Sequence, residues 1–131
     1  MRTLVLVLAA ATAAAAATVA RADTMHPRFA ARLTGMGEHG IVNFTLHAAT
    51  SRLCWTFDVA ATGLTAASIR DAHGMLLARL GPAYRSRGCA AVPKRALTVL
   101  ESKPASYRVW VDSRGHPGDL RGRLFAGMAH M

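Results

Sequence analysis

Acidic residues, aromatic residues and cysteines are all scarce in this chain of 131 residues. Seven aspartates and glutamates stand against 16 lysines and arginines, and aromatic residues make up 6% of the sequence. No glycine-rich phosphate loop, zinc-protease helix motif or catalytic cysteine signature is present. The sequence therefore predicts a protein that is not an enzyme and carries no cofactor. The alternative is a small enzyme whose residues meet only in space, with Ser68, Asp71 and His73 as a candidate cluster.

Long hydrophobic runs are absent beyond the first 20 residues. Residues 1–22 have a basic start, the aliphatic run Leu4–Leu8, an alanine-rich stretch and the small-x-small sequence Ala20-Arg21-Ala22. This pattern predicts a secretory signal peptide over residues 1–22, cleaved after Ala22. The alternative is an uncleaved anchor, for which the run is short and weakly hydrophobic. Residues 23–131 are then one periplasmic or secreted domain with no transmembrane span.

Two cysteines remain in the exported part, Cys54 and Cys89. In an oxidising compartment, one intramolecular disulfide is the default for such a pair. The alternative is a pair of redox or metal-binding thiols, but neither cysteine belongs to a Cys-x-x-Cys motif. We predict a Cys54–Cys89 disulfide.

Hydrophobic and polar residues alternate repeatedly along the remaining chain. Residues 41–47 place Val42, Phe44 and Leu46 on one face of a strand, and glycines and prolines separate this segment from others like it. The other predicted strands are 28–33, 53–59, 69–72, 75–80, 96–101, 107–112 and 120–125. Many short strands and no long helical period predict a single all-β domain, a Greek-key β-sandwich of the immunoglobulin or superoxide-dismutase kind.

Some segments are less sharply defined. Residues 64–69 and 94–103 are compatible with helical turns. Gly88 and Pro117-Gly118 are predicted turns, and residues 127–131 are predicted to be a loose end.

Three stretches, ARLTGMGEHGIVNFTL, LCWTFDVAATGL and YRVWVDSRGHPGDLRGRL, follow one another in an order that resembles the chordin-type (CHRD) domain. The resemblance covers about residues 28–126 and implies a secreted all-β module. The family pattern has a His-x-His near its middle and a further histidine in the strand that begins with tyrosine. Here Ser68, Arg70 and Val111 stand at those positions, so the resemblance does not extend to any property that depends on those histidines.

Arginines near the end of the chain have two predicted roles. Arg121 is predicted to form a structural ion pair with Glu38 or Asp119, because a planar guanidinium suits a carboxylate. Trp110 and Phe125 alternate with the predicted core positions and stand among Arg108, Arg121 and Arg123. The face bearing Trp110, Arg108, Arg121 and Arg123 is therefore a candidate ligand face for an anionic glycan or an acidic protein surface. The alternative is that a loop covers this face or that the strand register is shifted by one residue. A specific nucleic-acid partner is not expected.

Several histidines lie near methionines, and thioether with imidazole suits copper. The pairs are Met25-His26, Met36 with His39, His73 with Met75, and Met128 with His130 and Met131. None of these spacings is diagnostic of a metal site. A periplasmic copper- or metal-binding protein is the alternative function.

Overall fold

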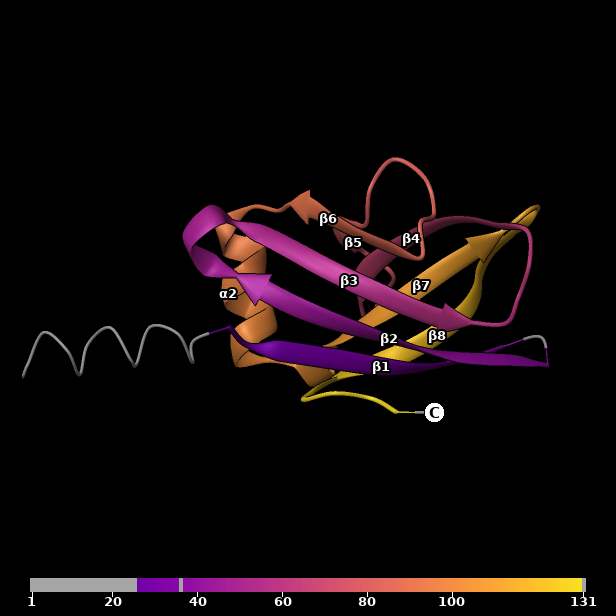
Figure 1. Cartoon of the computed structure of the whole chain (residues 1–131), viewed down its shortest axis with the longest axis horizontal. Helices are drawn as coiled ribbons and strands as arrows, with labels where there is room; N and C mark the ends of the chain where they lie inside the picture. Colours follow the sequence, from indigo (N-terminus) through magenta and orange to yellow (C-terminus); the bar gives the residue numbers. More distant parts are fainter. Residues whose placement is uncertain (1–25, 36, 131) are drawn as a thin grey trace, which may run out of the picture.

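A computed structural model describes residues 26–35 and 37–130 of the chain, and the predicted signal peptide, residues 1–22, lies outside them. This part of the chain is all-β, with one short α-helix (Figure 1). The strands are β1 (Arg28–Gly35), β2 (Glu38–His47), β3 (Arg52–Val59), β4 (Leu64–Asp71), β5 (Leu76–Arg79), β6 (Arg87–Ala91), β7 (Tyr107–Ser113) and β8 (His116–Ala126). The helix is α2 (Lys94–Ser102), and the short 3-10 turns are η1 (Ala48–Thr50) and η2 (Pro104–Ser106).

The eight strands form one antiparallel sheet in the order β5-β4-β7-β8-β1-β2-β3-β6. The sheet curls on itself, so that β1, β2 and β3 pass in front of β7 and β8 at an angle (Figure 1). The chain places β4 beside β7 and β3 beside β6, which are non-consecutive pairings of the Greek-key type. The predicted fold class is confirmed, with the two layers belonging to a single nearly barrel-like sheet.

Alternation along the strands builds the core between the layers. Val42, Phe44 and Leu46 from β2 are buried, and so are Leu120 and Leu124 from β8. They join one cluster with the inward residues of the neighbouring strands and of α2. On each strand, the residues that alternate with the buried ones face outward, as predicted for Trp110 of β7 and Phe125 of β8.

Tertiary packing overrides two local predictions. Residues 64–69 belong to strand β4 and not to a helical turn, because Ala67 and Ile69 alternate into the core. Residues 96–101 belong to helix α2 and not to a strand. Their buried residues are Ala96, Leu97 and Leu100, which recur at the spacing of one helical face.

Two predicted turns are also wrong. Gly88 lies within β6, opposite Trp55. Pro117-Gly118 lies within β8, and the turn between β7 and β8 is at Arg114-Gly115. The register shifts between Val111 and Ser113, so extra residues of β8 bulge beside β7.

The end of the chain is docked, which contradicts the prediction of a loose end. The Asn43 side chain accepts a hydrogen bond from the Ala129 N–H (2.7 Å) and donates one to the Ala129 carbonyl (3.1 Å). Ala129 is buried with Ala30 and Ile41 on the outer face of β1 and β2. Arg32 donates to the His130 carbonyl at 3.1 Å. The tail therefore covers an apolar patch that the sheet would otherwise expose.

Residues 26–35 and 37–130 contain no helix that is both long and apolar enough to cross a membrane.

Candidate ligand-binding face

Strand pairing aligns four arginines on the outer face of the sheet. Arg70 of β4 lies opposite Arg108 of β7, and Arg108 lies opposite Arg123 of β8. The register that pairs Ala31 with Leu124 and Thr34 with Arg121 places Arg32 of β1 opposite Arg123. We call Arg32, Arg70, Arg108 and Arg123 the arginine row. Sequence reasoning identified Arg108 and Arg123, but it did not assign Arg32 and Arg70 to this face.

A second line of residues runs beside the arginine row. Arg79 of β5 lies opposite Ser68, Ser68 lies opposite Trp110, and Trp110 lies opposite Arg121. Together with the arginine row, this line forms the basic face. The four residues predicted for a ligand face, Trp110, Arg108, Arg121 and Arg123, are all on it.

Trp110 stands between arginines from both flanking strands. The Cζ atom of Arg121 lies 3.9 Å from the centroid of the indole ring, and that of Arg70 lies 5.0 Å from it. A guanidinium at this distance is attracted by the electron-rich face of the ring. The indole therefore holds the two arginines in place and is not an open stacking platform for a ligand.

The bulge in β8 positions Arg121 over the indole. Gly118 adopts a positive φ of 64°, a conformation that favours glycine. Its N–H donates to the Asp112 carboxylate at 2.5 Å, and its carbonyl accepts from Arg121 Nε at 3.0 Å. A Cβ atom at Gly118 would come within 2.9 Å of both Arg121 and Trp110. The absence of a side chain there allows the stack to form.

A turn after β4 positions Arg70. Its Nε donates to Ser68 Oγ at 3.1 Å and its Nη1 to the Gly74 carbonyl at 3.0 Å. The Asp71 carboxylate accepts from the N–H groups of Met75 (3.0 Å) and His73 (2.8 Å), which closes the turn around Gly74. The Met75 N–H is the main cause that holds the pKa of Asp71 below its ordinary value. The contribution of this carboxylate to the stability of the fold is therefore complete above the pKa that Asp71 has in the unfolded chain. It is lost as the pH falls through the pKa that Asp71 has in the folded protein.

Replacing Trp110 with leucine is expected to destabilise the fold by about 1–3 kcal/mol, because two cation–π contacts are lost together. Urea unfolding followed by circular dichroism measures this loss. In the background of Arg121→Gln, the cost of Trp110→Leu should fall by about 1 kcal/mol, because the two residues are coupled. In the background of Arg79→Gln, on the same face, it should be unchanged. Equal costs in both backgrounds would show that the stack contributes nothing.

Asp119 has a partner other than the predicted Arg121. Its Oδ2 accepts from Ser113 Oγ at 2.7 Å, and its buried Oδ1 has no hydrogen-bond partner in the described part of the chain. The contacts of the Arg121 guanidinium are the Trp110 ring and the Gly118 carbonyl. An ion pair of Arg121 with Glu38, which opens β2, stays a prediction.

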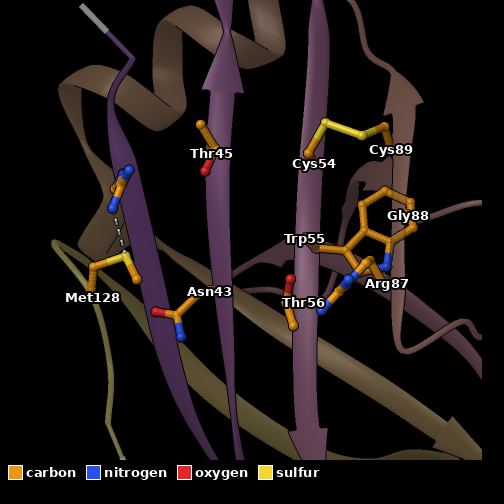
Figure 2. A pocket seen from close by; sticks show the side chains of 10 residues that line it. Asn43, Thr45, Cys54, Trp55, Thr56, Arg87, Gly88, Cys89 and Met128 are labelled. Atoms are coloured by element: carbon orange, nitrogen blue, oxygen red, sulfur yellow. Dashed lines mark hydrogen bonds between the residues drawn. A yellow bond between two sulfur atoms is a disulfide. The ribbon is translucent and has the colours of Figure 1, made fainter. Parts of the chain in front are cut away.

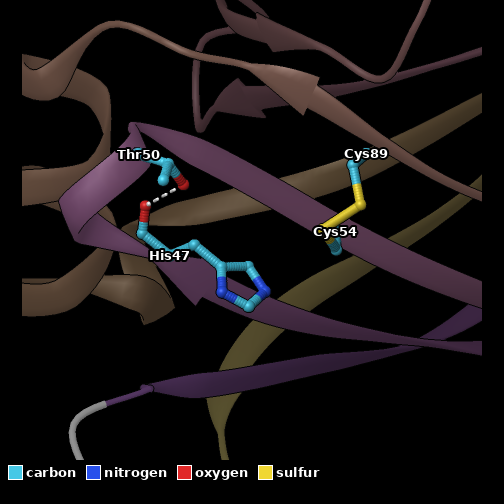
Figure 3. Close-up of a disulfide and its surroundings, with 4 residues drawn as sticks. All are labelled: His47, Thr50, Cys54 and Cys89. Atoms are coloured by element: carbon cyan, nitrogen blue, oxygen red, sulfur yellow. Dashed lines mark hydrogen bonds between the residues drawn. A yellow bond between two sulfur atoms is a disulfide. The ribbon is translucent and has the colours of Figure 1, made fainter. Parts of the chain in front are cut away.

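The predicted disulfide is confirmed. Cys54 of β3 and Cys89 of β6 are directly opposite, with their Cα atoms 4.0 Å apart (Figure 3). The disulfide lies beside a shallow hollow of about 450 Å³ on the outer face of β1, β2, β3 and β6 (Figure 2). The residues that line it are Arg28, Asn43, Thr45, Cys54, Trp55, Thr56, Arg87, Gly88, Cys89 and Met128. They include no carboxylate, histidine or free thiol.

The described histidines do not gather into a metal site. Among residues 26–35 and 37–130, no group of three or more His, Cys, Asp and Glu side chains is placed to hold a metal ion. The rings of His26 and His47 meet, with centroids 5.0 Å apart, but Arg52 lies opposite His47 and adds a positive charge. Met25, Met36 and Met131, which belong to the predicted copper pairs, lie outside the described residues.

The three positions at which the resemblance to the CHRD domain would place histidines do not form one site. Ser68 and Arg70 face outward on β4, where they contact each other. Val111 is fully buried in the core. Histidines at these three positions would therefore be divided between the two faces of the sheet.

Fold and site together describe an all-β domain with a basic outer face. No family model, no curated protein and no solved structure matches the chain.

Proposed function

We propose that the chain is an exported, non-catalytic binding module, akin to the CHRD domain, whose basic face holds an anionic partner. The observation that carries this proposal is the arginine row. By strand register, four arginines stand at neighbouring positions on four adjacent strands of the sheet. An anionic glycan or an acidic protein surface is the kind of partner that such a face attracts.

The energetics of the arginine row support a partner. Like charges directly opposite in a sheet are destabilising by a few tenths of a kcal/mol or more per pair. Asp112 and Asp119, the acids on β7 and β8, are hydrogen-bonded within the bulged hairpin. An anion above the arginine row would relieve the repulsion between its members.

Features outside the basic face support the remaining parts of the proposal. The signal-peptide pattern of residues 1–22 supports export, and the Cys54–Cys89 disulfide fits an oxidising compartment. The non-catalytic role stays a proposal that rests on the absence of a catalytic motif in the sequence. No observation favours the copper-binding alternative strongly enough to propose it as a second function.

Salt-dependent binding to an immobilised anionic glycan such as heparin tests the proposal. We expect the double variant Arg108→Gln, Arg123→Gln to raise the dissociation constant about tenfold or more, which is ~1.4 kcal/mol for two surface ionic contacts. The dependence of the logarithm of affinity on the logarithm of salt concentration should flatten by about one released counterion per arginine.

The double variant Arg52→Gln, Arg87→Gln is the matched control. It removes the same charge from β3 and β6, outside the basic face. Its affinity should stay within about twofold of the parent, since distant exposed charges are screened. Equal losses in the two double variants would mean that net charge alone drives adsorption, and the proposal would fail.

A further inference from the structure

We infer that the partner is a linear polysaccharide with an acidic group, sulfate or carboxylate, on each sugar, lying across the strands along the arginine row. This inference rests on the proposed function and narrows it to one class of ligand and one binding direction.

The direction follows from the register. The members of the arginine row lie side by side on β4, β7, β8 and β1. Neighbouring strands are ~4.8 Å apart, so the arginine row runs perpendicular to the strands over about 14 Å. A ligand that meets all four guanidiniums must therefore be extended and must carry anionic groups at a short, regular repeat.

The arginine row has two defined ends. At the β5 end, Arg70 is opposite Leu76, whose side chain is 44% exposed. At the other end, Ile41 of β2 follows Arg32 and is buried under the docked tail, and Asp58 of β3 comes next. The negative charge of Asp58 repels a polyanion that continues past Arg32. The binding site is therefore finite and extends over the four arginines from Arg70 to Arg32.

Hydrogen bonds within the protein position the arginine side chains at the two ends of the arginine row, but they use only some of the N–H donors. Within residues 26–35 and 37–130, Arg70 uses two of its five N–H donors, for Ser68 and Gly74. Within the same residues, Arg32 lies 5.9 Å from the Phe125 centroid and uses one of its five N–H donors, for the His130 carbonyl. Such prior positioning lowers the conformational entropy that is lost on binding.

Polar groups suited to a sugar lie at the Arg32 end. A shallow hollow of about 320 Å³ is lined there by Arg32, Leu33, Thr34, His39, Gly40, Ile41 and His130. The hydroxyl of Thr34 and the imidazoles of His39 and His130 are hydrogen-bonding groups that match sugar hydroxyls. A basic strip with a polar hollow at one end fits a chain of acidic sugars.

Other polyanions fit this face less well. Single-stranded nucleic acid needs free aromatic surfaces on which bases stack, but Arg70 and Arg121 occupy the Trp110 ring and Arg32 lies over Phe125. A protein partner needs an apolar centre in the interface. In the described part of the chain, the exposed large hydrophobic residues are Met75, Leu76 and Met128, none of which lies between members of the arginine row.

A length series of heparin oligosaccharides, titrated calorimetrically into the purified protein, tests the inference. Affinity should rise steeply from the disaccharide to the tetrasaccharide and then level off, because four arginines are then occupied. Arg108→Gln, in the middle of the arginine row, should weaken tetrasaccharide binding about threefold, half of the free-energy cost expected for the double variant, and disaccharide binding less. The Arg52→Gln, Arg87→Gln variant should reproduce the parent curve.

Comparison ligands separate the inference from the proposed function. Single-stranded oligothymidylate and polyglutamate of matched charge should bind at least about tenfold more weakly than the oligosaccharide. If either ligand binds as tightly as the oligosaccharide and Arg108→Gln weakens its binding, the anion-binding face stands and the glycan inference is overturned. If affinity grows in proportion to length without levelling off, the finite site is overturned. If Arg108→Gln weakens the binding of no polyanion more than the control variant does, the proposed function itself is overturned.

Discussion

Replacing Gly122 with alanine is expected to lower the free energy of unfolding by more than ~4 kcal/mol, in the range reserved for severe backbone or core disruption. A Cβ atom at Gly122 would overlap the carbonyl oxygen of Arg32 and lie 2.8 Å from its carbonyl carbon. These are main-chain atoms of β1, so they cannot rotate away as a side chain would. Strands β1 and β8 would have to separate at the middle of the sheet.

Gly63→Ala is the control for this experiment. Gly63 has a φ of 72° and no atom within 4 Å of an added Cβ, so alanine there costs only the left-handed backbone, about 1 kcal/mol. Urea unfolding followed by tryptophan fluorescence compares the two variants, and circular dichroism detects a chain that does not fold. If the two variants were equally stable, the close approach of β1 and β8 would be wrong. The same overlap would displace Arg32 from Arg123 and so disturb the arginine row.

Removing the disulfide by Cys54→Ala with Cys89→Ala is expected to cost about 3–4 kcal/mol, the value for a closed loop of this length. The cysteines are 35 residues apart in the sequence. The disulfide also fastens β6, an edge strand that pairs with β3 alone. Urea unfolding of the parent and the double variant measures the loss. A reducing agent should destabilise the parent and leave the double variant unchanged.

Thr56→Ala with Arg87→Ala is the matched control for the disulfide. Thr56 and Arg87 are a directly opposed pair on the same two strands, and their loss should cost no more than ~1 kcal/mol. Trp55 reports on the same region, because its Nε1 donates to the Arg85 carbonyl at 3.0 Å and its ring contacts Gly88. If the cysteine variant were as stable as this control, the disulfide would be a minor contributor to the fold.

The alternation of hydrophobic and polar residues predicts much of this fold, because it marks the buried and the outward face of most strands. The alternation in residues 41–47 and 107–112 was sufficient to place Phe44 in the core and Trp110 outside it. Residues 94–102 were ambiguous, since a short amphipathic segment satisfies both periods and its burial decides between them. The docked tail could not be predicted, because its binding depends on Asn43, which is 86 residues away.

The candidate site depends still more on pairing between distant segments. Arg108 and Arg123 were recognised because they lie in one predicted hairpin. Arg32 and Arg70 join them only through the pairings of β1 with β8 and of β4 with β7. Neither pairing has a local signal in the sequence, so half of the arginine row was hidden until the strand order was known. The sequence predicts a turn at Pro117-Gly118 where the structure has a bulge, because a Pro-Gly pair is compatible with both.

The place of the first strand in the sheet has a kinetic consequence. Strand β1 lies between β2 and β8, so its pairing is complete only when Phe29 meets Ala126 at the far end of the domain. Closing so long a loop is entropically costly, and folds that rely on such contacts fold slowly. The Cys54–Cys89 crosslink lies between the two ends and shortens the chain that must close. We therefore expect the pairing of β1 with β8 at the centre of the sheet to form late, after the local hairpins of β1, β2 and β3.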